Sequence, residues 1–229
     1  MPDFKYKIEC NDAFVWLQDI EDNSVDLIIT DPPYESLEKY RAIGTTTRLK
    51  VSKASSNQWF PIMPNERFEE LFTQLYRVLK NHRHFYLFCD VETMFIVKPI
   101  AEKVGFKFWK PLIWDKVRIG MGYHYRSRYE NILFFEKGKR KLNDLSVADI
   151  ITCPRVHRGY PTEKPVGVSE TLIKQSTAPN ELIIDPFLGS GSVAEASLKN
   201  NRVFWGCDIN SDATKLARQR LKNITPEYT

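Results

Sequence analysis

Two short apolar runs in this chain end in the dipeptide Asp-Pro, with an aromatic residue close behind. The first run, 25–30, is followed by Asp-Pro-Pro-Tyr at 31–34, and the second, 182–184, by Asp-Pro-Phe at 185–187. Apolar runs of this length that are stopped by proline are typical of buried strands. Ligands of open α/β sheets bind at the carboxyl ends of the strands. The two runs therefore predict an open α/β sheet with both segments at one edge.

The segment 31–34 carries groups that together suit an aromatic amine. The carboxylate of Asp31 and the carbonyl of Pro32, in a backbone that Pro33 restricts, can accept two hydrogen bonds from one amino group. The ring of Tyr34 can stack on the heterocycle that bears this amine. The set indicates a site for the exocyclic nitrogen of adenine or cytosine. The alternative is a plain turn after the strand, with Tyr34 packed in the core.

A glycine turn follows the second Asp-Pro segment. Gly189 and Gly191 allow the backbone to approach a ligand closely, and the helix expected over 193–199 offers free N–H groups at its start. A third apolar run, 203–207, ends at Asp208, where an acid commonly binds ribose hydroxyls. This unit of strand, turn, helix and strand predicts half of a nucleoside-binding site.

Each part of this second site has an alternative explanation. Gly189, Gly191 and Ala194 also satisfy the pattern Gly-x-Gly-x-x-Ala, which makes an NAD-dependent oxidoreductase a competing hypothesis. Asp208 could instead cap the helix expected over 211–221. The symmetry of the two Asp-Pro segments favours a nucleoside cofactor beside an amine-bearing ring. An oxidoreductase would leave the Asp-Pro-Pro-Tyr segment without a function.

Several separated motifs resemble those of one known family. Asp-Pro-Pro-Tyr at 31–34 precedes Phe-x-Gly-x-Gly at 187–191. Tyr-Pro-Thr-Glu-Lys-Pro at 160–165 resembles the family's His-Pro-Thr-Glu-Lys-Pro, with Tyr160 in place of the histidine, and Cys-Asn-Asp-Ala at 10–13 resembles its Gly-Asp-Ala segment. Nearly the whole chain is thus similar to the circularly permuted β group of DNA amino-methyltransferases, which use S-adenosylmethionine.

The resemblance implies a role for individual residues. Asp31 and the Pro32 carbonyl would bind the target amino group, and Tyr34 would stack on a base flipped out of the duplex. Lys164 would approach the methionine carboxylate, although a loop lysine paired with an acid is the plainer alternative. The implied catalytic residues are Asp31, Pro32, Pro33 and Tyr34. The implied cofactor-binding residues are Asp12 at the adenine, Asp208 at the ribose, and Asp31, Lys164, Asp185, Phe187, Gly189, Gly191 and Ser192.

The implied activity is methyl transfer to the exocyclic N6 of adenine in DNA, with N4 of cytosine as the alternative. In the family, Asp at the first position of the motif more often accompanies adenine, and Ser more often accompanies cytosine. A non-catalytic nucleic-acid binder is a further alternative, which the intact Asp31 argues against. Enzymes that methylate RNA or protein glutamine share the logic of amine binding, but they are not expected to show the permuted order.

Hydrophobic periodicity and the resemblance together predict a doubly wound, Rossmann-like mixed sheet of seven strands with an antiparallel end pair. One methyltransferase domain would span 1–229, with the first strand, 6–10, beside the cofactor strands. The chain between 135 and 160 leaves little room for the separate target-recognition domain of many family members. Sequence readout would then come from loops 35–65 and 116–129, or from the second subunit of a homodimer.

Basic residues gather in the loops, although the net charge is only +4. Segment 39–65 has five Lys or Arg and no acid, and segment 116–129 has four, again with no acid. Segment 137–141 adds four more, and Arg155 belongs to another small cluster with His157 and Arg158. Clustered basic loops are an electrostatic footprint for phosphates, although solvated surface is the commoner fate of any one cluster. The expected DNA-binding residues are Arg41, Arg48, Lys50, Lys53, Arg118, Arg126 and Arg128.

Composition excludes several other classes of protein. Hydrophobic residues make up 42% and aromatic residues 13% of the 229 residues, which indicates a globular rather than a disordered chain. No apolar run is long enough to span a membrane, and the four cysteines lack metal-ligand spacing. We therefore expect a reduced, cytoplasmic protein of prokaryotic or phage origin that uses neither a metal nor a membrane.

Overall fold

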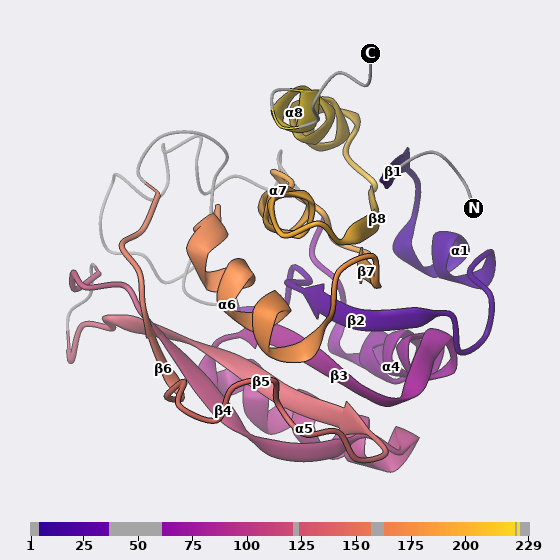
Figure 1. Cartoon of the computed structure of the whole chain (residues 1–229). Helices are drawn as coiled ribbons and strands as arrows, with labels where there is room; N and C mark the ends of the chain where they lie inside the picture. The colour runs from indigo at the N-terminus through magenta and orange to yellow at the C-terminus, as the bar shows by residue number, and fades with distance from the viewer. Residues whose placement is uncertain (1–4, 37–60, 121–123, 157–162, 223, 225–229) are drawn as a thin grey trace.

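The computed structural model describes residues 5–36, 61–120, 124–156, 163–222 and 224. At its centre is an eight-stranded mixed sheet with the strand order β1-β8-β7-β2-β3-β5-β4-β6. Helices lie on both faces of this sheet (Figure 1). The predicted doubly wound class is therefore confirmed, but the sheet has eight strands where the sequence analysis expected seven.

The parallel part of the sheet contains five neighbouring strands. They are, in spatial order, β1 (Tyr6–Cys10), β8 (Val203–Asp208), β7 (Leu182–Asp185), β2 (Val25–Thr30) and β3 (Leu79–Cys89). The first strand of the chain thus pairs with the last, as the permuted order predicts. Because the five strands are parallel, their carboxyl ends share one edge, and both Asp-Pro segments lie there.

The other end of the sheet contains the antiparallel pair. β5 (Tyr129–Lys137) runs antiparallel to both β3 and β4 (Lys107–Asp115), so β4 points in the same direction as β3. The loop 116–128 between β4 and β5 therefore starts at the carboxyl edge that carries the Asp-Pro segments. The additional strand, β6 (Ile150–Thr152), pairs with β4 at the margin of the sheet. Three residues are too few to show a period-2 pattern, which is why the sequence did not predict β6.

The helices form one layer on each face of the sheet (Figure 1). On one face are α1 (Ala13–Gln18), α5 (Val91–Val104) and α4 (Phe68–Val78), which follows the short 3₁₀ turn η2 (Asn65–Arg67). On the other face are α6 (Val166–Ser176), α7 (Ser192–Lys199) and α8 (Ser211–Lys222). No helix of the described residues combines the length and the apolar character that crossing a membrane requires.

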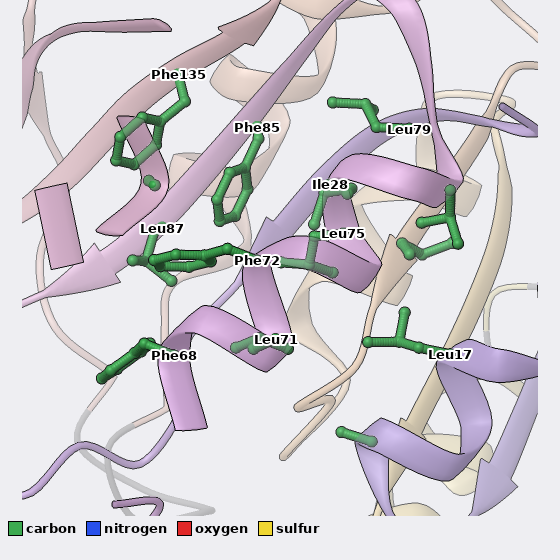
Figure 2. Close-up of a cluster of buried hydrophobic side chains, with 14 of the residues drawn as sticks. Leu17, Ile28, Phe68, Leu71, Phe72, Leu75, Leu79, Phe85, Leu87 and Phe135 are labelled. Carbon is green, nitrogen blue, oxygen red and sulfur yellow. The ribbon is translucent and has the colours of Figure 1, made fainter. Parts of the chain in front are cut away.

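The helical periodicity of α4 explains how it packs on the sheet. Its apolar residues Phe68, Phe72 and Leu75 recur at the spacing that places them on one helix face, and all three are fully buried. Figure 2 shows these side chains directed towards the sheet, among them Phe72 beside Phe85 of β3. The rings of Phe72 and Phe85 meet edge to face, with their centroids 5.8 Å apart. This packing fixes α4 against β3, the neighbour of the strand that leads into the Asp-Pro-Pro-Tyr segment.

We predict that Phe72→Ala lowers the free energy of unfolding by roughly 3–5 kcal/mol, because it removes a fully buried ring and leaves a cavity. The matched control is Phe95→Ala in α5, where the ring is 72% exposed and the expected change is within about 0.5 kcal/mol. Urea unfolding followed by circular dichroism measures both. Equal losses in the two variants would contradict the proposed core.

Candidate active site

A cavity of about 830 Å³ opens at the carboxyl edge of the sheet. Loops after β2, β7 and β8 form one side of it, and β4, β5 and the segment after β6 form the other. Every predicted catalytic and cofactor-binding residue except Gly191 lines this cavity. These residues are Asp12, Asp31, Pro32, Pro33, Tyr34, Lys164, Asp185, Phe187, Gly189, Ser192 and Asp208. Residues that lie up to about 200 positions apart in the chain thus share one site.

The Asp-Pro-Pro-Tyr segment leaves β2 and forms part of the cavity wall. The Pro33 carbonyl accepts a hydrogen bond of 2.7 Å from the N–H of Met63, which holds the segment against the chain leading into α4. Tyr34 is only 7% exposed and belongs to the hydrophobic core, yet it also lines the cavity. Burial raises the pKa of its hydroxyl, so Tyr34 stays neutral. The core role and the stacking role of Tyr34 are therefore compatible.

Four charged side chains of alternating sign form a chain across the cavity wall. Lys164 donates a hydrogen bond to Oδ2 of Asp31 and makes an ion pair of 3.0 Å with Glu130. Glu130 in turn pairs with Lys116 at 2.6 Å. The side chains of Lys164, Glu130 and Lys116 are only 11–13% exposed. Ion pairs this well buried interact much more strongly than those in water.

The pKa values of these charged side chains depend on burial and on their charged partners. Burial raises the pKa of Asp31 above its ordinary value, against the opposing effect of the Lys164 charge. Burial alone would also raise the pKa of Glu130, but Lys164 and Lys116 bring it below its ordinary value. The pKa of Lys164 is raised, since its two carboxylate partners outweigh the cost of burying the ammonium. Lys164 and Glu130 are therefore charged at neutral pH.

Sequence reasoning missed Glu130 as a site residue. It stands at the start of β5, opposite Trp114 of β4, and shares the ammonium of Lys164 with Asp31. Its negative charge also acts directly on Asp31 and helps to raise the pKa of that carboxyl. The sequence feature that could have identified Glu130 is its position as an acid between the basic loop 116–129 and the apolar strand that follows. Lys164 is a loop lysine paired with acids, as the plainer alternative expected. One of these acids is Asp31, the catalytic candidate itself.

The glycine turn between β7 and α7 adopts a conformation that favours glycine. Gly189 and Gly191 have φ angles of +51° and +78°, where other residues are strained. A Cβ on Gly191 would also lie 2.8 Å from the Cβ of Ala217 in α8, which explains the close packing of α7 on α8. The N–H of Gly189 donates a hydrogen bond of 2.8 Å to Oδ2 of Asp208, so the turn and the end of β8 are joined.

Asp208 ends β8, whereas Asp12 lies two residues beyond the end of β1, and the two differ in whether they cap a helix. Asp208 accepts a second hydrogen bond, from the N–H of Asn210, and Asn210 accepts one from the N–H of Asp212 at the start of α8. The residue that caps this helix is thus Asn210, and the capping alternative for Asp208 is wrong. Asp12 does cap a helix: its Oδ1 accepts from the N–H groups of Phe14 and Val15 at the start of α1.

Asp185 joins the two Asp-Pro segments from below the cavity. Its carboxylate is 3% exposed, and Oδ1 accepts hydrogen bonds from the Thr30 hydroxyl at 2.8 Å and from the N–H of Phe187 at 3.0 Å. Burial raises the pKa of Asp185 to about 7. Both hydrogen bonds restrict the segments that follow β2 and β7, so Asp185 holds the site as well as lining it.

Only part of the expected DNA-binding set falls within the described residues. Arg118, Arg126 and Arg128 lie on the β4–β5 loop, next to Lys116 and the cavity. Arg128 makes a two-point ion pair of 2.6 and 2.7 Å with Asp115, so its guanidinium braces the base of this loop. Arg41, Arg48, Lys50 and Lys53 are outside the described residues. The described part of the chain contains no group of three or more potential metal ligands.

Comparison with known proteins identifies the family. The family model for DNA methylases that act as N6/N4 methyltransferases matches residues 25–151 and 150–219, and the chain belongs to this family. Type II methyltransferase M.HpaI of Haemophilus parainfluenzae is 27% identical over 243 residues, which cover 94% of this chain and 74% of that one. This membership removes the oxidoreductase hypothesis.

Two solved structures share the fold. The complex of M1.HpyAVI with S-adenosylmethionine has a TM-score of 0.69 at 22% identity and covers 94% of this chain and 100% of that one. PvuII DNA methyltransferase, described as cytosine-N4-specific, has a TM-score of 0.72 at 12% identity and covers 98% and 90%. At these identities the likeness is one of fold.

The raised pKa of Asp185 predicts how the free energy of unfolding changes with pH. Below about pH 4 this carboxyl is protonated in both the folded and the unfolded chain. Between pH 4 and about 7 the unfolded chain loses the proton while the folded chain keeps it, so rising pH lowers the free energy of unfolding. Asp185→Asn removes this titration, and its amide oxygen can accept both hydrogen bonds that Oδ1 accepts.

Relative to wild type, Asp185→Asn should therefore gain stability as the pH rises from 4 to 8, by up to roughly 4 kcal/mol. Urea unfolding of both proteins across this range measures the difference. Parallel curves of unfolding free energy against pH would show that Asp185 is not the group that titrates.

Proposed function

We propose that this protein transfers a methyl group from S-adenosylmethionine to N6 of adenine in DNA. S-adenosylmethionine is its cofactor, and DNA methylation is the activity of its family. The observation that carries the proposal is the position of Asp31 and Tyr34 in the same cavity as the glycine turn and Asp208. One cavity can then hold the target base and the methyl donor side by side. Its volume of about 830 Å³ lies within the range of small-molecule sites.

The residues around the glycine turn suit the cofactor. When bound, it supplies an electrophilic methyl group on a sulfonium. Gly189 lines the cavity with a positive φ angle, so the backbone reaches the cavity there without a side chain in the way. Asp208 is assigned to the ribose, because a carboxylate at the end of the second strand of such a unit commonly binds the hydroxyls. Asp12, two residues beyond the end of β1 next to β8, is assigned to the adenine edge.

Asp31 is assigned to the target amine. The exocyclic nitrogen is a poor nucleophile, because its lone pair is delocalised into the ring. Accepting its two hydrogens with Asp31 and the Pro32 carbonyl favours a pyramidal nitrogen with an available lone pair. Lys164 bonds Oδ2 of Asp31, and among the described residues Oδ1 has no hydrogen-bond donor. Oδ1 is therefore the atom assigned to the amine, while Lys164 keeps the carboxylate oriented.

Asp31 is also the proposed acceptor of the proton that the amine loses. Burial raises the pKa of Asp31, so this carboxylate is a better base than one in water. The base must leave the duplex to reach Asp31, and stacking on Tyr34 offsets part of the unstacking cost. Lys164 is then a positioning residue for Asp31, in place of the contact with the methionine carboxylate that the family resemblance implies.

Adenine is favoured because the motif begins with Asp, although the same Asp31, Pro32 and Tyr34 contacts can serve cytosine N4. The fold is compatible with either base, since PvuII methyltransferase, described as cytosine-N4-specific, shares it. Target choice thus depends on the walls of the base pocket rather than on the catalytic segment.

The central prediction is that cells expressing the wild-type protein accumulate N6-methyladenine in their DNA and that cells expressing Asp31→Asn do not. Asparagine keeps the volume of Asp31 but cannot accept the proton. Nucleoside mass spectrometry measures the product, and calorimetry with S-adenosylmethionine confirms that the variant still binds cofactor.

Tyr34→Phe is the matched control, because stacking needs the ring and not the hydroxyl; it should keep most of the activity. Near-normal methylation by Asp31→Asn would remove the proposed role of Asp31. N4-methylcytosine without N6-methyladenine would overturn the choice of base and leave the mechanism.

A second prediction concerns the cofactor. Asp208→Ala should weaken binding of S-adenosylmethionine by roughly 1–3 kcal/mol, since it removes charged hydrogen bonds to the ribose and to the glycine turn. Asp212→Ala, at an exposed carboxylate of α8, is the control and should bind normally. Isothermal calorimetry gives both affinities. Equal affinities in the two variants would exclude the ribose assignment.

A further inference from the structure

The cations of the cavity wall differ in how they are paired. Among the described residues, four cationic side chains line the cavity. Arg67 bonds Glu70, Lys116 pairs with Glu130, and Lys164 bonds Asp31 and Glu130. The fourth, Arg155, has neither an ion pair nor a side-chain hydrogen bond to any described residue, and its Nε is buried from solvent.

An arginine at this position without a partner among the described residues needs an explanation. A buried donor without a partner costs free energy, and native proteins leave few of them. Arg155 also lies close enough to Lys116 for its positive charge to lower the lysine's pKa, an effect that adds to that of burial. Asp31 and Glu130 already balance Lys164 and Lys116, and no described carboxylate pairs with Arg155. Among the described residues, the positive charge of Arg155 therefore remains uncompensated. This charge balance favours an anionic ligand at Arg155.

The position of Arg155 in the sheet indicates which half of the site it serves. The glycine turn and Asp208 follow β7 and β8, on one side of β2. Arg155 follows β6, at the opposite margin of the sheet, and its segment is tied to β4 by the hydrogen bond from Trp114 Nε1 to the Cys153 carbonyl. Asp31 at the end of β2 lies between the two in the strand order. Arg155 is thus on the side of Asp31 that is remote from the cofactor residues.

The β4–β5 loop continues the positive surface from Arg155. A Cβ on Gly120 of this loop would lie 3.3 Å from Nη2 of Arg155, so the guanidinium rests against the loop. The loop also carries Arg118 and Arg126, which stand at exposed positions. A nucleic-acid backbone that follows this surface reaches the cavity at Arg155.

We propose that Arg155 binds the phosphate of the target nucleotide when its base occupies the cavity. The inference rests on the proposed function. A guanidinium matches a phosphate by two parallel hydrogen bonds, which suits a site that must hold a nucleotide in one orientation. The other anion within reach of a methyltransferase site is the methionine carboxylate of the cofactor, but the strand order places the cofactor residues on the far side of Asp31.

The test compares Arg155→Gln and Arg155→Lys with wild type. Initial rates of methyl transfer to sheared, unmethylated genomic DNA are measured at several NaCl concentrations, and calorimetry gives the affinity for S-adenosylmethionine. For Arg155→Gln we expect KM for DNA to rise about tenfold with kcat less affected. We also expect log kcat/KM to decrease less steeply with log salt, with the magnitude of the slope smaller by about one. Arg155→Lys should keep the slope, and cofactor affinity should stay unchanged in both.

The control is Lys103→Gln, which removes one exposed charge at the end of α5 remote from the cavity and should leave every parameter at the wild-type value. If Arg155→Gln keeps the wild-type KM and salt slope, the proposed function is not affected, but the phosphate assignment is overturned. Weaker binding of S-adenosylmethionine with an unchanged salt slope would assign Arg155 to the cofactor carboxylate and overturn it as well. Absence of methyl transfer by the wild-type protein would refute the proposed function, and the phosphate site with it.

Discussion

The hydrogen bond between Thr30 and Asp185 joins the two halves of this site. Thr30 ends β2 and Asp185 ends β7, so the bond of 2.8 Å connects the last residues of two neighbouring parallel strands. The same carboxylate oxygen accepts the N–H of Phe187, which directs the chain into the glycine turn. The Asp-Pro-Pro-Tyr segment and the glycine turn therefore share one buried anchor. A carboxyl this deeply buried has a raised pKa, and its cost to stability grows as the pH rises towards 7.

Much of the fold could be predicted because the strands of the parallel region are short apolar runs with clear ends. β2 is buried along its whole length, and its neighbour β7 is buried at all but its first residue. β8, the next strand beyond β7, is buried at every second position over its first four residues. The start of β3 has no apolar pattern, because residues 80–83 read as Lys-Asn-His-Arg, and of these only Arg83 pairs with β5. β6 was missed because its position depends on β4 rather than on its own sequence.

The residues of the cavity could be predicted where a motif marks them, and were missed where tertiary contacts alone bring them to the cavity. Asp31, Tyr34 and Asp208 stand at strand ends that the sequence marks. Glu130 has no such mark, and its importance comes from Lys164, a residue 34 positions later whose ammonium it shares with Asp31. No periodicity predicts an ion pair between a strand and a loop, because tertiary packing alone brings them together.

The row of alternating charges from Asp31 to Lys116 also explains why the cavity wall can accommodate a polyanion such as DNA. Lys164 and Lys116 balance Asp31 and Glu130, so this part of the wall adds no net charge when the two carboxylates are ionised. A wall that is neutral within itself neither repels DNA nor holds the cofactor by charge alone. In the proposed function, selectivity for a nucleotide then depends on groups outside this row of charges: the Tyr34 ring for the base, and Arg155, which has no partner among the described residues, for the phosphate. On this proposal the buried charges keep Asp31 in position, while binding energy comes from the neighbouring groups.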